Sequence, residues 1–253
     1  VDCIDVEAAE RLGIQVTNAA DANSGSVAEF TLGLILSLAK KLPQSRDGLR
    51  KEGWSIRPQI TTFDLEGKTL GVLGMGRIGT AVARKASYGF GMKVLGYRRN
   101  LPGDICADYG ILTSDLDKVI RNSDFLSIHL PYTKDTFHLV SCEKLELMKP
   151  DAYLLNLGRG EVVDQAALRE LLLSNRLAGA ALDVFEGEIP DADDPLLHMD
   201  QVIATPHIAG LSKQAMERLS YQAALGITEV LEGRKVTYPV NHPEKYASDV
   251  SVA

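Results

Sequence analysis

From residue 68 onward, short runs of apolar residues alternate with segments in which apolar residues recur every three or four positions. The runs are predicted to be buried strands, because strands covered on both faces lack the alternation of polar and apolar positions. They comprise residues 70–73, 93–97, 125–130, 153–157, 179–184 and 201–205. One helical segment, residues 164–175, begins at the capping residue Asp164 and has amphipathic spacing. The alternation predicts an α/β fold with a doubly wound parallel sheet.

Two further helices are predicted outside this series. Residues 26–42 are mostly apolar, with Ser26 as the cap and Glu29 three positions later, which is the arrangement of a capping box. A polar stretch follows at about residues 43–58. The final helix, residues 213–231, ends before Gly233, and an irregular polar tail closes the chain.

A glycine-rich turn follows the first predicted strand. Its residues are Gly74, Met75, Gly76, Arg77, Ile78 and Gly79, and a helical segment comes next. In a dinucleotide-binding turn the first glycine allows a tight bend, the second lets backbone amides approach a pyrophosphate, and the third lets helix and strand pack closely. The alternative is an ordinary turn that contains three glycines. An ATP-type phosphate loop is excluded, because it needs glycine at the position of Thr62.

The end of the second predicted strand indicates which nicotinamide cofactor is preferred. Enzymes that use NAD usually carry an acidic residue there, which accepts hydrogen bonds from the ribose hydroxyls. Here the strand ends in Arg98 and Arg99, with no carboxylate beside them. Two guanidinium groups can bind a 2′-phosphate through forked hydrogen bonds, so NADP is the predicted cofactor and NAD the alternative. A solvated pair of arginines is the other interpretation.

Composition narrows the class of protein. With 253 residues, 45% of them apolar, and a net charge of -7, the chain is predicted to be globular and to have no nucleic-acid partner. Cys3, Cys106 and Cys142 have unrelated spacings, which predicts free thiols in a reducing compartment such as the cytoplasm, and no metal site. Cys142 has no base beside it and is interpreted as structural. The longest apolar run, at about residues 30–39, is too short to cross a membrane.

Four polar residues follow the later strands of the predicted sheet. Arg159 follows one strand, Asp183 and Glu188 follow the next, and His207 follows the last. The loops after parallel strands emerge at one edge of a sheet, so these four residues and the glycine turn are expected on a single rim.

These residues lie in three segments that resemble the signature blocks of the D-isomer-specific 2-hydroxyacid dehydrogenases. The segments are Asn156-Leu-Gly-Arg159-Gly-Glu-Val-Val-Asp164, Ala181-Leu-Asp183-Val-Phe-Glu186-Gly-Glu188 and Thr205-Pro-His207-Ile-Ala-Gly. The similarity extends from the first residues of the chain to about residue 240.

The resemblance implies catalytic roles for three residues. Arg159 would hold the substrate carboxylate and polarise the 2-oxo group. His207 would donate a proton to the developing alkoxide during reduction and accept it during oxidation. Glu188 would pair with His207, orient its ring and favour the imidazolium. Taken singly, His207 and Glu188 could equally be a capping residue and a solvated acid, but the three blocks together favour the catalytic roles.

The resemblance also implies contacts to the cofactor and an oligomeric state. Asp183 would contact the nicotinamide side, and the backbone at Leu130 and Pro131 would lie along the cofactor. Because relatives pair through the cofactor domain and the helix at residues 26–42 is apolar on several faces, a homodimer is expected.

Members of this family have two lobes, and the chain resembles only part of that arrangement. Residues 1–22 are predicted to be a residual part of the substrate lobe and the hinge, with Cys3 where the family usually has Asn. Residues 23–210 are predicted to form the Rossmann cofactor domain, and residues 211–253 the helix and tail that return to the substrate lobe. The chain is then either a fragment of a longer enzyme or a cofactor domain without a complete cleft.

Two functions are compatible with these features. The first is hydride transfer between NAD(P)H and a small 2-oxo or 2-hydroxy acid such as glyoxylate or hydroxypyruvate. The second is a non-catalytic nucleotide sensor or a corepressor-like interaction module. Retention of Arg159, Glu188 and His207 favours the enzyme, whereas the missing lobe favours the module.

Overall fold

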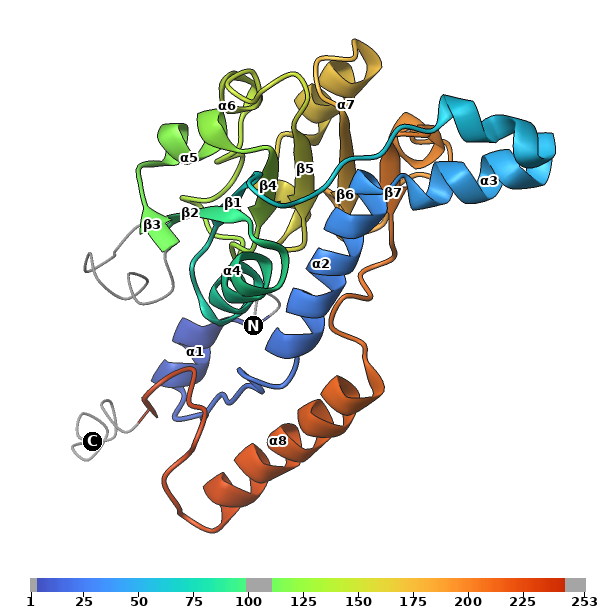
Figure 1. The fold of residues 1–253 in the computed structure, drawn as a ribbon. Coiled ribbons are helices and arrows are strands. Elements are labelled where there is room, and N and C mark those ends of the chain that lie inside the picture. The colour runs from blue at the N-terminus through green and yellow to red at the C-terminus, as the bar shows by residue number, and fades with distance from the viewer. Residues whose placement is uncertain (1–3, 99–110, 244–253) are drawn as a thin grey trace. The chain divides into compact units, whose positions relative to one another are not determined.

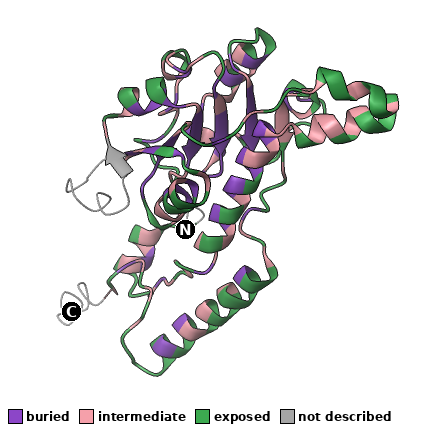
Figure 2. Ribbon diagram, viewed as in Figure 1, coloured by how far each residue is buried: buried purple, intermediate pink, exposed green. Residues whose placement is uncertain are grey.

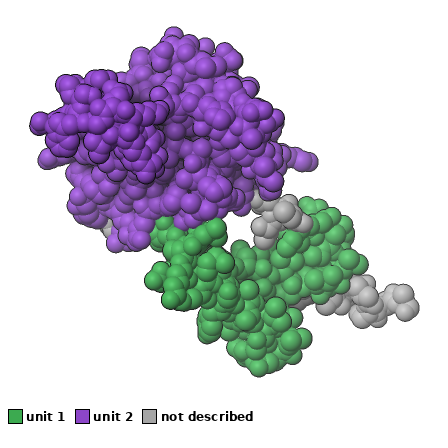
Figure 3. All heavy atoms as spheres, turned by 90° about the vertical axis from the view of Figure 1, so that its right-hand side faces the viewer, with its two compact units in different colours: residues 1–26, 210–253 green, residues 27–209 purple. Residues whose placement is uncertain are grey.

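The structure is a computed structural model that describes residues 4–98 and 111–243, with only the backbone for residues 111–113. The chain divides into two compact units, coloured separately in Figure 3. One unit is formed by residues 27–209, and the other by residues 1–26 together with residues 210–253. The assignment of residues 1–22 and 211–253 to a substrate lobe stays a prediction.

The larger unit is built on a seven-stranded parallel sheet (Figure 1). The strands are β1 (Thr69–Leu73), β2 (Lys93–Tyr97), β3 (Ile111–Thr113), β4 (Phe125–Ile128), β5 (Tyr153–Asn156), β6 (Gly179–Leu182) and β7 (Val202–Ala204). Their order is β3-β2-β1-β4-β5-β6-β7, so the direction of winding reverses between β1 and β4. All six strands predicted from the sequence are present, and β3 is an additional one. The doubly wound α/β fold is confirmed.

Helices cover both faces of this sheet. Buried residues of α2 (Ser24–Ala39) and α4 (Arg77–Phe90) share one apolar cluster with alternate strand residues such as Leu70 and Val72. Buried residues of α5 (Leu116–Asn122), α6 (Cys142–Leu145) and α7 (Gln165–Leu173) share a second cluster with Leu73 and Leu126. Strands β1, β4, β5 and β6 are therefore buried from both sides, as Figure 2 shows, which explains their mostly apolar runs.

The prediction of a helix over residues 26–42 is wrong at both ends. Helix α2 starts at Ser24, so Ser26 lies within the helix and does not cap it. It ends at Ala39, and Lys41 takes a left-handed conformation with φ of 47° before a new helix starts. That helix, α3 (Leu42–Glu52), and the 3-10 helix η1 (Gly53–Gln59) occupy the polar stretch, for which the sequence predicted no helix. They extend away from the sheet and bury none of their residues (Figure 1).

The other two predicted helices are confirmed. The side chain of Asp164 caps α7, accepting a hydrogen bond from the backbone N–H of Ala167 at 2.9 Å. Helix α8 (Lys213–Leu231) has the predicted bounds and is followed by Gly233 in a left-handed conformation.

Helix α8 belongs to the smaller unit together with α1 (Val6–Arg11). Segments from the two parts of this unit meet there, because the side chain of Asn241 accepts a hydrogen bond from the backbone N–H of Val16 at 2.8 Å. Glu229 of α8 is buried, and hydrogen bonds from the hydroxyl and backbone N–H of Thr237 hold the pKa of its carboxyl below its ordinary value.

Candidate active site

The glycine turn between β1 and α4 has the shape that a dinucleotide site needs. Gly74 has φ of 99°, and a Cβ there would lie 2.7 Å from the backbone oxygen of His129. A Cβ on Gly79 would overlap the backbone oxygen of Gly74, so only glycine lets α4 pack against the turn. Gly76 is the N-cap of α4, is exposed, and has open space where a Cβ would be. The residues therefore fit a pyrophosphate held at the N-terminus of a helix.

The end of β2 lies beside this turn. The backbone oxygen of Tyr97 accepts hydrogen bonds from the backbone N–H groups of Gly74 and Met75, at 2.9 and 3.3 Å. Arg98 follows Tyr97 directly and is exposed, whereas Arg99 lies outside the described residues. The backbone of Arg98 therefore continues from a residue that is hydrogen-bonded to the glycine turn.

The segment after β4 lies between the glycine turn and the loop that carries Arg159. A Cβ on Gly74 would lie 3.2 Å from the side chain of Leu130, and one on Gly158 would lie 2.6 Å from the Leu130 backbone oxygen. The hydroxyl of Thr136 donates to the backbone oxygen of Pro131 at 2.8 Å and fixes the next bend. This placement agrees with the expectation that the backbone at Leu130 and Pro131 lies along a cofactor, which stays a prediction.

His129, at the start of the same segment, is a half-buried histidine that the sequence did not single out for a role. Its Nε2 lies 2.8 Å from the hydroxyl of Ser127, and its buried Nδ1 has no hydrogen-bond partner among the residues that the structure describes. Burial lowers the pKa of His129 to about 3, so the ring is neutral at physiological pH.

Arg159 follows β5 in a loop that an asparagine side chain holds. The amide of Asn156 donates to the backbone oxygen of Arg159 at 2.9 Å and accepts from the backbone N–H of Gly158 at 3.1 Å. The Arg159 guanidinium donates to the Gly158 oxygen at 2.9 Å. Arg159 is half-buried and occupies the N-cap position of the 3-10 helix η3 (Gly160–Val162) without a side-chain capping bond.

Asp183 is a buried carboxylate that holds the loop of His207. It accepts hydrogen bonds from the Thr205 hydroxyl at 2.6 Å and from the backbone N–H groups of Ile208 and Ala209, both at 3.0 Å. Its own backbone oxygen accepts from the N–H of His207 at 2.9 Å. Within the described part of the chain, the hydrogen bonds of its carboxylate go to this loop, and the expected contact with the nicotinamide side stays a prediction.

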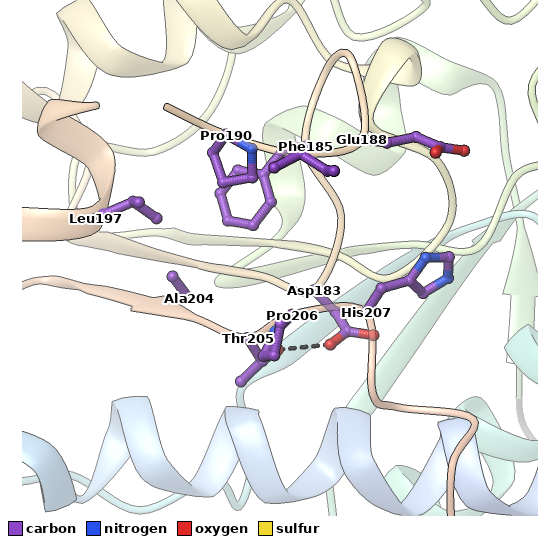
Figure 4. A pocket seen from close by; sticks show the side chains of 10 residues that line it. Asp183, Phe185, Glu188, Pro190, Leu197, Ala204, Thr205, Pro206 and His207 are labelled. Atoms are coloured by element: carbon purple, nitrogen blue, oxygen red, sulfur yellow. Dashed lines mark hydrogen bonds between the residues drawn. The ribbon is translucent and has the colours of Figure 1, made fainter. Parts of the chain in front are cut away.

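Glu188 and His207 line a cavity of about 470 Å³ at the carboxyl ends of β6 and β7. Figure 4 shows their side chains at the same end of the cavity, with Leu197 at the opposite end. The lining residues are Asp183, Phe185, Glu188, Ile189, Pro190, Leu197, Ala204, Thr205, Pro206 and His207. Among the described residues no hydrogen bond or ion pair joins Glu188 to His207, so their pairing stays a prediction.

The sheet brings the three predicted catalytic residues to one edge. Strands β5, β6 and β7 are neighbours, with Asn156 opposite Leu182 and Leu182 opposite Ala204. Arg159, Glu188 and His207 therefore leave adjacent strand ends, although Arg159 does not line the cavity itself. Within the described residues no group of His, Cys, Asp and Glu side chains could hold a metal ion, and no helix is long and apolar enough to span a membrane.

Two polar side chains that the sequence did not single out brace this edge. His138 pairs with Glu186, and Gln165 accepts a hydrogen bond from the backbone N–H of Glu186. No local pattern marks either residue, because each contact joins segments that are 21 or 48 positions apart.

Comparison with known proteins agrees with this geometry. Residues 32–209 match the family described as D-isomer specific 2-hydroxyacid dehydrogenase, NAD binding domain. D-3-phosphoglycerate dehydrogenase of Methanocaldococcus jannaschii is 41% identical over 244 residues, which cover 96% of this chain and 46% of the relative. Glyoxylate reductase of Korarchaeum cryptofilum is 39% identical over 226 residues, which cover 88% of this chain and 68% of the relative.

Solved structures give the same result. The NADPH-dependent glyoxylate/hydroxypyruvate reductase of Sinorhizobium meliloti, in complex with NADP and malonate, is 32% identical with a TM-score of 0.85. That alignment covers 95% of this chain and 74% of the relative. The chain spans about half the length of the curated phosphoglycerate dehydrogenases that it matches. In sequence, sheet topology and glycine turn, the chain belongs to the D-isomer specific 2-hydroxyacid dehydrogenase family.

Proposed function

We propose that the protein to which this chain belongs is an oxidoreductase that transfers a hydride between NAD(P)H and a small 2-oxo or 2-hydroxy acid. The observation that carries the proposal is the placement of Arg159, Glu188 and His207 at adjacent strand ends of a sheet that also carries a dinucleotide-binding turn. Relatives named glyoxylate reductase and glyoxylate/hydroxypyruvate reductase support a substrate of two or three carbons.

Each residue has chemistry suited to one part of the reaction. The nicotinamide supplies or accepts the hydride, and the protein provides orientation and charge. The planar guanidinium of Arg159 matches a carboxylate and stays charged, so it would anchor the acid. The His207 imidazole would give its proton to the alkoxide oxygen, and the negative charge of Glu188 at the same end of the cavity would favour the protonated ring.

The test is steady-state reduction of glyoxylate and hydroxypyruvate by the full-length protein. His207→Asn is expected to lower kcat by about 10²- to 10⁴-fold, since general acid catalysis contributes that much. Arg159→Lys is expected mainly to raise KM, because an ammonium cannot form the forked contact. The control is His198→Asn, which changes an exposed histidine in the 3-10 helix η4 (Pro195–His198). If the protein binds the cofactor tightly but turns over no 2-oxo acid, the proposal of an oxidoreductase is wrong, and a non-catalytic nucleotide-binding module is favoured.

NADP preference is part of the proposal. It is supported by Arg98, which is exposed beside the glycine turn, and by the lack of a carboxylate at the end of β2. We expect NADPH to bind about ten- to a hundredfold more tightly than NADH, since a charged hydrogen bond contributes about 1.5–3 kcal/mol. Arg98→Asp should remove this preference, whereas Arg121→Asp at an exposed position of α5 should not. Equal affinities in the unchanged protein would contradict NADP preference.

We further propose that the protein forms a two-fold dimer and works in a reducing compartment such as the cytoplasm. An apolar hollow on α2 and α4, lined in part by Leu36, Tyr88 and Phe90, supports the dimer, as does the exposed arm of α3 and η1. A stable interface of this kind buries more than about 1,000 Å². Light scattering should report twice the monomer mass, and Leu36→Lys should shift it to monomer. Cys142, a free and exposed thiol, supports the reducing compartment.

A further inference from the structure

The loop that carries Glu188 is held from two sides just before that residue. On one side, the backbone N–H of Glu186 donates to the side-chain oxygen of Gln165 on α7 at 2.9 Å. On the other side, the carboxylate of Glu186 lies 2.9 Å from Nε2 of His138, which comes from the segment after β4. We call His138, Gln165 and Glu186 the Glu186 clamp. Its members come from three segments of the larger unit.

The His138 side of the clamp is fixed by its own neighbours. The ring of Phe137 stacks on that of His138, with 4.0 Å between centroids and 13° between planes. The backbone N–H of His138 donates to the backbone oxygen of Glu161 at 2.8 Å, which holds His138 at φ of 45°. The Glu161 carboxylate also lies near the loop, 3.5 Å from the backbone N–H of Gly187.

The Gln165 side is fixed by a buried carboxylate. The Gln165 amide donates to Asp194 at 3.3 Å, and the Arg169 guanidinium donates to the same oxygen at 3.0 Å. Asp194 is 9% exposed and lies beyond Glu188 in the chain. Gln165 therefore links both ends of the loop, Glu186 and Asp194, to helix α7.

Glu188 itself has few contacts that could set its position. It follows Gly187, and both take left-handed conformations, with φ of 80° and 66°. Its backbone N–H donates to the oxygen of Phe185 at 3.1 Å, but within the described residues its exposed side chain forms no hydrogen bond. Its location at the His207 end of the cavity thus depends on the residues that anchor the loop.

We propose that the Glu186 clamp positions Glu188 for the reaction, with His138 and Gln165 as positioning residues that act through it. The inference rests on the proposed function, in which Glu188 acts on His207. Releasing the clamp leaves the Gly187–Glu188 turn free to move the carboxylate away from the imidazole. A displacement of a catalytic group by about 1 Å can lower the catalytic rate by up to a hundredfold.

The test uses two substitutions in the full-length protein. Gln165→Met keeps the length of the side chain but removes the acceptor for the Glu186 N–H. His138→Asn tolerates the left-handed backbone but is too short to reach Glu186. The control is Glu170→Gln, which changes an exposed carboxylate on the same helix α7. The measurements are the pH profile of 2-oxo acid reduction, cofactor affinity, and hydrogen exchange of the backbone at residues 185–189.

We expect each clamp variant to lose about tenfold in kcat/KM, and the alkaline limb, where the reduction rate falls as the pH rises, to move to lower pH. Glu188→Gln should move this limb in the same direction, because glutamine carries no negative charge to favour the protonated His207 ring. Cofactor affinity should stay within about twofold, because the glycine turn is unchanged. When a clamp substitution is added to Glu188→Gln, kcat/KM should fall by less than about twofold further, since the clamp acts through Glu188. Hydrogen exchange at residues 185–189 should become about tenfold faster.

Three results would overturn the clamp: unchanged exchange at residues 185–189, full losses that persist in the Glu188→Gln background, or an alkaline limb that stays in place while activity falls. If the unchanged protein reduces no 2-oxo acid, the proposed function fails, and the exchange measurement alone decides whether the clamp holds the loop.

Discussion

The low pKa of His129 leads to a quantitative prediction of how the free energy of unfolding changes with pH. An imidazole with a folded pKa of about 3 stays neutral when the protein is acidified, whereas the same ring in the unfolded chain takes up a proton near its ordinary pKa of 6.5. The unfolded state therefore binds more protons between pH 6.5 and about 3, and the free energy of unfolding must fall as the pH is lowered through that window.

The size of the effect follows from the two pKa values. Protonation of this histidine in the unfolded chain lowers the free energy of unfolding by about 2 kcal/mol between pH 7 and pH 5. Each pH unit below 6.5 contributes about 1.4 kcal/mol. His129 as a whole is partly exposed to solvent, although its Nδ1 atom is fully buried, so the full difference in pKa is an upper limit. We therefore expect a loss of about 1–2 kcal/mol over this range.

The assay is urea unfolding at pH 7, 6 and 5, compared with the variant His129→Gln. The glutamine can still reach Ser127 but takes up no proton, so its stability should fall by about 1–2 kcal/mol less between pH 7 and pH 5. His198→Asn, at an exposed position, is the control and should keep the slope of the unchanged protein. Parallel curves for His129→Gln and the unchanged protein would refute the reasoning, as would an NMR titration of the His129 ring with a midpoint near 6.5.

Three further substitutions test other parts of the fold. Gly79→Ala places a Cβ against the Gly74 oxygen, so isothermal titration should show cofactor affinity at least about tenfold weaker. Asp183→Ala leaves the Thr205 hydroxyl and two backbone N–H groups without their acceptor, and thermal unfolding should report a loss of about 3 kcal/mol. Asp164→Ala removes the cap of α7 and should cost about 1 kcal/mol by the same measurement.

The sheet could be predicted from the sequence because its signal is local and repeated. Each of the six predicted strands lies in a short, mostly apolar run, and β2 has the predicted ends. Four of the runs extend past the strand that they contain, since residues such as Leu130, Leu157 and Val184 lie in the loops after β4, β5 and β6. Leu157 and Val184 are nevertheless buried, so hydrophobicity alone does not show where a strand ends.

The features that the sequence missed depend on contacts between distant segments. Helix α3, in the polar stretch, has no buried residue, so its sequence has no buried apolar face from which a helix could be predicted. Ser26 resembles a cap because Glu29 stands three positions later, but α2 has already begun at Ser24. The placement of Arg159, Asp183 and His207 was predictable because parallel topology decides it. The bonds from His138 and Gln165 to Glu186 were not, since no spacing rule relates residues on three separate segments.

Left-handed backbone conformations occur at the edge of the sheet that carries the proposed catalytic residues. Left-handed φ values occur at five described residues other than glycine: Lys41, His138, Asn175, Glu188 and His207. Each costs about 1–2 kcal/mol for a residue with a Cβ, and three of the five are His207, Glu188 and the clamp residue His138. A backbone hydrogen bond holds each of these three, to Asp183, Phe185 and Glu161 respectively. Glycine at any of them would relieve the strain but remove the imidazole or carboxylate, so the proposed roles of these side chains give a reason for a conformation that stability alone disfavours.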